Sequence, residues 1–179
     1  TPACDVGLSF GKPIIGTLKN GTWAVFLTSG YNNSSGKGKL YVLNALTGQL
    51  ISQISTNQGS STAPSGLAKV SSFVDFQRID NTVERLYGGD LLGNIWRFDV
   101  NDAIAPAGLE AALIGTATSA DGTPQAITTP PYLGVWNRKN YIFVGTGKLL
   151  SHSDLTSTQL HSIYGVIDPM SPGVVYSDL

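Results

Sequence analysis

Apolar residues along this chain gather in short runs in which apolar and polar positions tend to alternate, and turn residues separate the runs. Alternation is the period of a β-strand, and the three-and-four spacing of an amphipathic helix is nearly absent. Asparagine, glycine, serine and threonine fill the intervals, as is typical of tight turns. The pattern predicts strands at 12–18, 22–30, 39–45, 48–56, 66–75, 84–90, 94–100, 111–119, 125–136, 140–147, 162–168 and a short one at 173–177.

These strands fall into three similar blocks of four. The second strands end at Gly30, Asp90 and Gly147, about 60 residues apart, which is a repeat of blade length with added loops. The third strands share an aliphatic residue followed by an aromatic one, at 40–41, 95–96 and 163–164. A recurring four-stranded antiparallel unit is the signature of a β-propeller blade.

We therefore predict an all-β fold, a partial β-propeller of quinoprotein-like type with about three four-stranded antiparallel blades. The blades are expected at 9–57, 64–119 and 124–179. A closed ring normally needs four to eight blades, so the remaining blades are expected outside this chain. An open set of blades leaves apolar faces uncovered, and self-association of the truncated propeller is expected.

The stretch "LYGGDLLGNIWRFDV" at 86–100 places two strands on either side of a glycine-rich acidic turn. Its glycines are explained by tight packing and turn geometry. Along the second strand, Trp96 and Phe98 alternate with Arg97 and Asp99. This alternation predicts one face buried as core between blades and the other in contact with water.

Composition narrows the function classes. Only 13% of residues are charged, the net charge is −1, and no basic stripe could follow a phosphate backbone, so nucleic acid is excluded as a partner. Sparse lysine and glutamate with abundant small polar residues favours an exported protein. Cys4 is the sole cysteine, so the chain can form no internal disulfide.

Candidate catalytic chemistry is sparse. His152 and His161 lie near Asp154, but their spacing matches no metal-ligand pattern, and solvated loop residues are expected. Ser29 and Ser65 have no histidine and acid near them in a nucleophile motif. No residue is assigned a catalytic role, and we expect that the protein is not an enzyme.

Several phrases, in order, resemble the C-terminal propeller of the PilY/PilC family of type IV pilus tip-associated proteins. The resemblance covers roughly residues 10–169 and rests on "GYNN", "APSGLA", "YGGDLLGNIWRFD", "QAITTPPY" and "GTGKLL" followed by Asp154 and "YGVID". It implies a non-enzymatic protein of pilus biogenesis, twitching motility and surface adhesion, exported to the outer membrane, cell surface or pilus tip of a Gram-negative bacterium. The family's N-terminal domain is absent from this chain.

The partners that the resemblance implies are pilins, minor pilins or the outer-membrane pilus machinery. A host surface ligand is a further candidate, and it would bind the loops at 31–38, 57–65 and 148–161, because binding residues concentrate on loops held by a rigid scaffold.

Family members commonly carry a calcium loop of the form D-x-D-x-D-G-x-x-D before a tyrosine, here Tyr87. The matching positions place Glu84 and Asp80 as metal ligands, but Arg78 and Phe76 stand where two other acids would be. Calcium takes six to eight oxygen ligands, so a cationic and an apolar residue weaken the match.

A shift of register by one residue would bring oxygens from Asp75 and Gln77 instead. The competing interpretation is that 80–82 is simply a hairpin turn. We therefore expect no cofactor and calcium binding that is weak at best, with Arg78 balancing the charge of Asp80 or Glu84.

The alternative function is the propeller of a quinoprotein dehydrogenase that uses pyrroloquinoline quinone, whose blades often carry A-x-D-x-x-T-G-x-x-x-W. The stretch "VLNALTGQLIS" keeps the Thr-Gly pair at 47–48, but it has Val42, Asn44 and Ser52 at the other three positions. A shared fold does not confer a shared reaction.

Overall fold

The protein folds almost entirely into antiparallel β-structure, as predicted. The computed structural model describes residues 5–75, 78–101 and 110–170. The strands are β1 (Ile14–Thr17), β2 (Trp23–Thr28), β3 (Lys39–Asn44), β4 (Leu50–Ser55), β5 (Val70–Phe73), β6 (Arg85–Gly89), β7 (Asn94–Asp99), β8 (Ala111–Thr116), β9 (Tyr132–Trp136), β10 (Lys139–Gly145) and β11 (Ile163–Ile167). One 3-10 helix, η1 (His152–Thr156), precedes β11.

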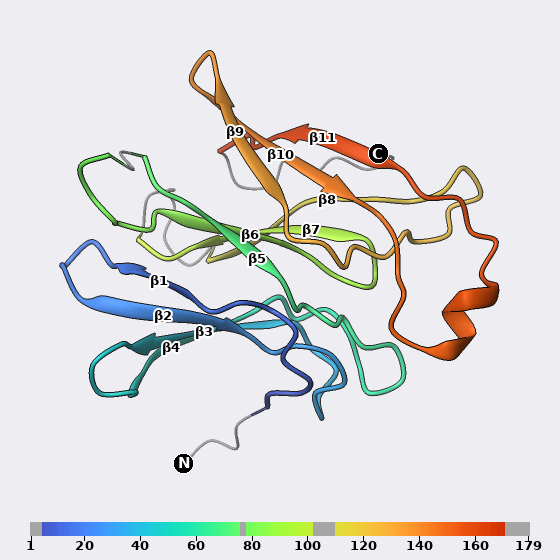
Figure 1. The fold of residues 1–179 in the computed structure, drawn as a ribbon, viewed down its shortest axis with the longest axis horizontal. Helices are drawn as coiled ribbons and strands as arrows, with labels where there is room; N and C mark the ends of the chain where they lie inside the picture. The colour runs from blue at the N-terminus through green and yellow to red at the C-terminus, as the bar shows by residue number, and fades with distance from the viewer. Residues whose placement is uncertain (1–4, 76–77, 102–109, 171–179) are drawn as a thin grey trace.

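The strands form three sheets that follow one another along the chain. Sheet 1 has the order β1-β2-β3-β4, sheet 2 the order β5-β6-β7-β8, and sheet 3 the order β9-β10-β11. Figure 1 shows sheet 2 lying between the other two, with the blue N-terminal sheet and the orange C-terminal sheet on opposite sides. The all-β, open propeller arrangement is therefore confirmed, while the fourth strand predicted at 173–177 lies outside the described residues.

Two strands have less than half of their predicted length. The run at 125–136 becomes a strand only from Tyr132, because Pro130 and Pro131 lack the N–H that a strand ladder needs. The run at 66–75 forms β5 only from Val70, and Gly66 has a φ of 62° that breaks an extended conformation.

Each junction between sheets contains an apolar core. Trp96 and Phe98 of β7 pack with residues of sheet 1, such as Phe26 and Leu40, and confirm the predicted core between blades. The second core joins sheets 2 and 3, and its members include Phe73, Tyr87, Ile95, Ile114, Ile142, Val144 and Val166.

The expected solvated face of β7 is wrong. Arg97 is 1% exposed and Asp99 is 6% exposed, and every residue of β7 is buried. The physical reason is that sheets 1 and 3 cover both faces of sheet 2, so the face of β7 that carries Arg97 and Asp99 also meets a core and not water.

Connections at one end of the three sheets are bonded into a continuous surface, which we call the loop face (29–38, 56–69, 90–93, 117–131 and 146–162). The amide of Ser65 donates to the carbonyl of Gly36 at 2.7 Å, and the amide of Leu91 donates to the carbonyl of Ser65 at 2.7 Å. The amide of Ile127 donates to the carbonyl of Asp90 at 2.9 Å, which extends the connection to sheet 3. Figure 1 shows these connections on the side that carries η1, opposite the β1-β2 and β9-β10 turns.

No helix within the described residues is long and apolar enough to cross a membrane.

Candidate functional site between sheets 2 and 3

The acidic turn between β6 and β7 is organised by the carboxylate of Asp90, which is fully buried. The carboxylate accepts hydrogen bonds from the Ser65 hydroxyl, the Leu92 amide, the Asn94 amide and side chain, and the Trp96 indole, all at 2.9–3.0 Å. Burial raises the pKa of Asp90, and the bonds from Trp96 and Asn94 oppose that rise. The turn is therefore a structural corner, as its glycines predicted, and the role of Asp90 is an addition from the structure.

The glycines of this turn have separate packing reasons. A Cβ on Gly89 would lie 2.2 Å from Cγ2 of Ile127, so sheet 2 could not approach the 125–131 segment with a larger residue there. Gly93 has a φ of 80°, which favours glycine at the corner. Both observations agree with the predicted role of tight packing and turn geometry.

A buried polar cluster joins sheets 2 and 3. The hydroxyl of Tyr87 donates to Oδ2 of Asp168 at 2.6 Å, and Nη1 of Arg97 lies 2.5 Å from Oδ1 of the same carboxylate. Burial, followed by the charge of Asp168, raises the pKa of Tyr87 well above its usual value. The sequence phrases "YGGDLLGNIWRFD" and "YGVID" thus meet through these three side chains, although 71 residues separate Arg97 from Asp168.

A second buried arginine lies on the same face of sheet 2. Arg85 lies opposite Asp99 in the register of β6 and β7, and its Nη2 lies 3.4 Å from Oδ1 of Asp75. Its guanidinium also sits 4.9 Å from the centre of the Phe73 ring, which is a cation–π contact. Two buried arginines between sheets are a feature that alternation along β6 and β7 did not predict.

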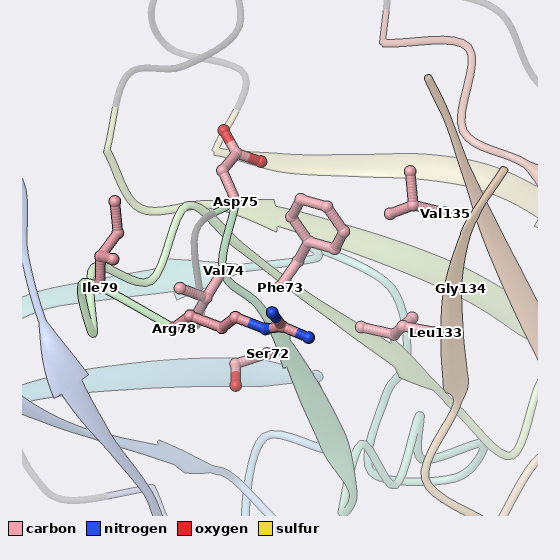
Figure 2. Close-up of a pocket in the computed structure, with 9 residues that line it drawn as sticks. All are labelled: Ser72, Phe73, Val74, Asp75, Arg78, Ile79, Leu133, Gly134 and Val135. Carbon is pink, nitrogen blue, oxygen red and sulfur yellow. The ribbon is translucent and has the colours of Figure 1, made fainter. Parts of the chain in front are cut away.

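A cavity of about 550 Å³ opens where β5 and β9 approach each other. Its lining residues come from β5, the turn after it, and β9, and they are Ser72, Phe73, Val74, Asp75, Arg78, Ile79, Leu133, Gly134 and Val135. Figure 2 shows the Arg78 side chain extending from the turn toward Leu133, below the ring of Phe73. Mainly apolar walls that also carry a serine, a carboxylate and a guanidinium form a candidate binding site, which we call the seam cavity.

The two predicted metal ligands lie in the same connection between β5 and β6. Asp80 is exposed, and its Oδ1 accepts a hydrogen bond from the Thr82 amide, which forms a local turn. Glu84 is partly buried, and burial, followed by the charge of Asp75, raises its pKa. Phe76 and Gln77, which occupy other positions of the loop, lie outside the described residues.

Within the described residues, no group of three or more histidine, cysteine, aspartate or glutamate side chains is placed to hold a metal ion. The ion pair in this connection joins Arg85 to Asp75. Arg78, which was expected to balance Asp80 or Glu84, instead lines the seam cavity.

The histidine loop also has a structural explanation. His152 and His161 are both exposed. The carboxylate of Asp154 accepts the amides of Leu150 and Ser151, each at 2.9 Å, and pairs with Lys148 at 3.0 Å. The bond from Leu150, followed by the one from Lys148, holds the pKa of Asp154 below its usual range. Asp154, which follows the "GTGKLL" phrase, therefore caps the start of η1.

The "GYNN" turn is anchored by a residue that the sequence analysis did not single out. Asp5 accepts hydrogen bonds from Asn33 at 3.0 Å and Ser34 at 2.7 Å, and its Oδ2 lies 2.6 Å from Nζ of Lys39. Burial raises the pKa of Asp5, but the bonds from Lys39 and Ser35 outweigh it and keep the pKa well below the usual value. No local pattern at Asp5 signals this role, because its partners are about 30 residues away along the chain.

Two four-stranded antiparallel sheets and one with three described strands stack in chain order and pack on one another through apolar cores, which defines this chain as part of a β-propeller. The sequence profile of the PilY1 beta-propeller domain matches residues 2–178, so the chain belongs to this family.

Curated relatives agree with this assignment. A type IV pilus biogenesis factor PilY1 homolog of Xylella fastidiosa is 35% identical over 91% of this chain and 13% of its own length. The type IV pilus biogenesis factor PilY1 of Pseudomonas aeruginosa is 31% identical over 94% of this chain and 16% of its own length. The chain thus spans less than a fifth of the length of these relatives, about 13–16%.

The fold agrees with a solved structure of the same family. The crystal structure of the Pseudomonas aeruginosa PilY1 C-terminal domain superposes with a TM-score of 0.80 at 24% identity, covering 98% of this chain and 40% of that one. The similarity extends over all three sheets described above.

Proposed function

We propose that this chain is part of a type IV pilus biogenesis factor and acts through protein surfaces. The observation that carries the proposal is the match to the PilY1 propeller family along nearly the whole chain, together with relatives that are named as pilus biogenesis factors. Pilus proteins, among them pilins, minor pilins and the outer-membrane machinery, are the partners this function requires. Export to the cell surface or pilus tip belongs to the same proposal.

The internal polar groups favour a non-enzymatic role. The carboxylates of Asp90, Asp154 and Asp168 are engaged in bonds that hold turns and sheets together. Because these acids hold the fold together, the residues left to bind partners are those at the surface. Binding residues of such rigid scaffolds lie on loops and in cavities. The quinoprotein alternative has only the Thr-Gly pair at 47–48 in its support.

Adhesion is a further part of the proposal, and the loop face supports it. The loops at 31–38, 57–65 and 148–161 all belong to this face, and the first two are bonded to each other through Ser65 and Gly36. A rigid, continuous loop surface suits recognition of a ligand outside the cell, because little order is lost on binding.

The test is deletion of the gene in its source organism, followed by counting surface pili and measuring twitching and adhesion. We expect few or no pili, restored by the full-length gene supplied in trans. Normal pili, twitching and adhesion in the deletion strain would contradict the proposal. Loss of a quinone-dependent oxidation would support the enzyme instead.

A further inference from the structure

We propose that the seam cavity binds an extended acidic segment of a partner protein, with a carboxylate of that segment on the guanidinium of Arg78. The inference rests on the proposed function, because it names the chemistry of one partner contact. It is tested by a binding measurement that does not depend on pilus assembly.

Two strands at the ends of their sheets form walls of the seam cavity. β5 is the terminal strand of sheet 2 and β9 is the terminal strand of sheet 3, so each has one edge without a neighbouring strand in its sheet. Strand edges present unpaired backbone donors and acceptors that an extended peptide can use. The two strands approach each other at the cavity, so an extended peptide bound there would lie beside both of them.

The seam cavity also carries the positive charge of Arg78. Arg78 makes no hydrogen bond or ion pair with any residue that the structure describes, and its side chain lies along the cavity (Figure 2). The acid beside it, Asp75, is paired with Arg85. Of the two charged residues that line the cavity, Arg78 is therefore the one left to bind a ligand, and a guanidinium binds a carboxylate with two parallel hydrogen bonds.

Apolar side chains surround the guanidinium of Arg78 in the cavity. Ile79 is 81% exposed and Val135 is 60% exposed, and both line the cavity with Phe73 and Leu133. Binding sites combine such walls with a small number of oriented polar groups, and about 550 Å³ lies within their usual range of roughly 300–1,000 Å³. Alternating apolar and acidic side chains on an extended segment would meet both features, because successive side chains point to opposite faces.

The same charge argues against a metal ion as the occupant. An arginine side chain has no lone pair to donate, and its positive charge repels a cation at close range. The cavity and the degenerate calcium loop share the turn after β5. Arg78 lies in that turn, and its positive charge disfavours calcium and favours a carboxylate.

The test is fluorescence anisotropy with a labelled, end-blocked peptide of alternating valine and glutamate, titrated with the purified protein. We expect binding to weaken about tenfold in Arg78→Gln, as the loss of a charge-assisted pair predicts, and to weaken in Ile79→Asp. Arg138→Gln is the matched control: it removes the same charge from an exposed turn residue that does not line the cavity, and binding should not change. Thermal melting of each variant checks that it folds.

Equal binding of the acidic peptide by Arg78→Gln and the unchanged protein would overturn the inference, as would absence of binding. Two control peptides carry glutamine or lysine in place of every glutamate, and equally tight binding of either one would also overturn the inference. Binding of free glutamate as tight as the peptide's would identify a small carboxylate as the ligand and also contradict an extended segment. None of these results bears on whether the deletion strain makes pili, so the two proposals fail separately.

Discussion

At the scale of single residues, the burial of charged side chains is what the sequence pattern failed to predict. Arg97 alternates with tryptophan and phenylalanine along β7. In a sheet with one face in solvent, this alternation would place Arg97 in water. It is instead buried and bonded to Asp168, which directly follows β11 of sheet 3. An ion taken out of water is tolerated only with a partner, so Arg97 and Asp168 depend on each other.

Asp168→Asn tests this dependence. The substitution removes the negative charge and leaves Arg97 buried without a counter-ion, so the free energy of unfolding should fall by about 3–5 kcal/mol. Urea denaturation followed by tryptophan fluorescence measures it. Asp121→Asn is the control, because Asp121 is exposed and accepts only a local bond from Thr123, and its stability should stay near that of the unchanged protein. A loss below about 1 kcal/mol in Asp168→Asn would mean that the ion pair contributes little.

Calcium binding is the second prediction at this scale. We expect calorimetric titration of metal-free protein to detect weak calcium binding at best, because Arg78 occupies a ligand position and Asp80 already accepts the Thr82 amide. Melting temperatures in calcium and in chelator should agree. Micromolar binding with a shift of several degrees that Glu84→Ala abolishes would show that the loop is a working calcium site after all.

At the scale of elements, close approach between neighbouring sheets depends on where glycine stands in a strand. In β6, a Cβ at Gly89 would meet Ile127 of the segment that precedes β9. In β10, a Cβ at Gly145 would meet nothing within 4 Å. The two glycines look alike in sequence, but only the first is required by the packing of this chain.

Gly89→Ala and Gly145→Ala form a matched pair. We expect Gly89→Ala to destabilise the protein by about 1–3 kcal/mol, because Ile127 and its backbone must shift to admit a methyl group. Gly145→Ala should be neutral within about 0.5 kcal/mol. Thermal and urea unfolding of both variants measures the difference, and equal stabilities would contradict the packing explanation.

At the scale of the whole molecule, sheets 1 and 3 each have one face without a neighbouring sheet among the described residues. On sheet 3, Trp136 is 71% exposed and Ile163 is 84% exposed, while the opposite face packs on sheet 2. On sheet 1, Ile15 and Trp23 are exposed, again opposite the packed face. Apolar faces of this kind associate with a complementary surface.

The 179-residue chain is therefore expected to self-associate through these faces. Size-exclusion chromatography with light scattering should give a mass above the monomer that rises with concentration. Trp136→Ser combined with Ile163→Ser should shift the protein toward the monomer. Leu46→Ser removes an equally exposed apolar residue from the turn between β3 and β4, and it should change nothing. A strict monomer at high concentration would contradict the prediction.

Sequence pattern alone determined most of the elements. Period-2 alternation and turn residues located eleven strands close to their observed positions, because each strand's pattern records which of its own residues face a core. The repeat of blocks indicated propeller blades for a similar reason, since each block has to bury the same kind of face. The predicted limits of the strands at 66–75 and 125–136 were wrong, because a glycine with positive φ and a proline pair shortened them.

Only the tertiary structure decided whether the second face of a strand is also covered by a sheet, and which distant side chains share a site. Stacking of sheets 2 and 3 brings together Arg97 with Asp168 and the walls of the seam cavity, and the fold of sheet 1 brings Asp5 to Asn33. A local pattern of alternation carries no information about partners so far apart in the chain. Alternation reports that two faces differ, but whether the polar one meets water or a neighbouring sheet depends on what the fold packs against it.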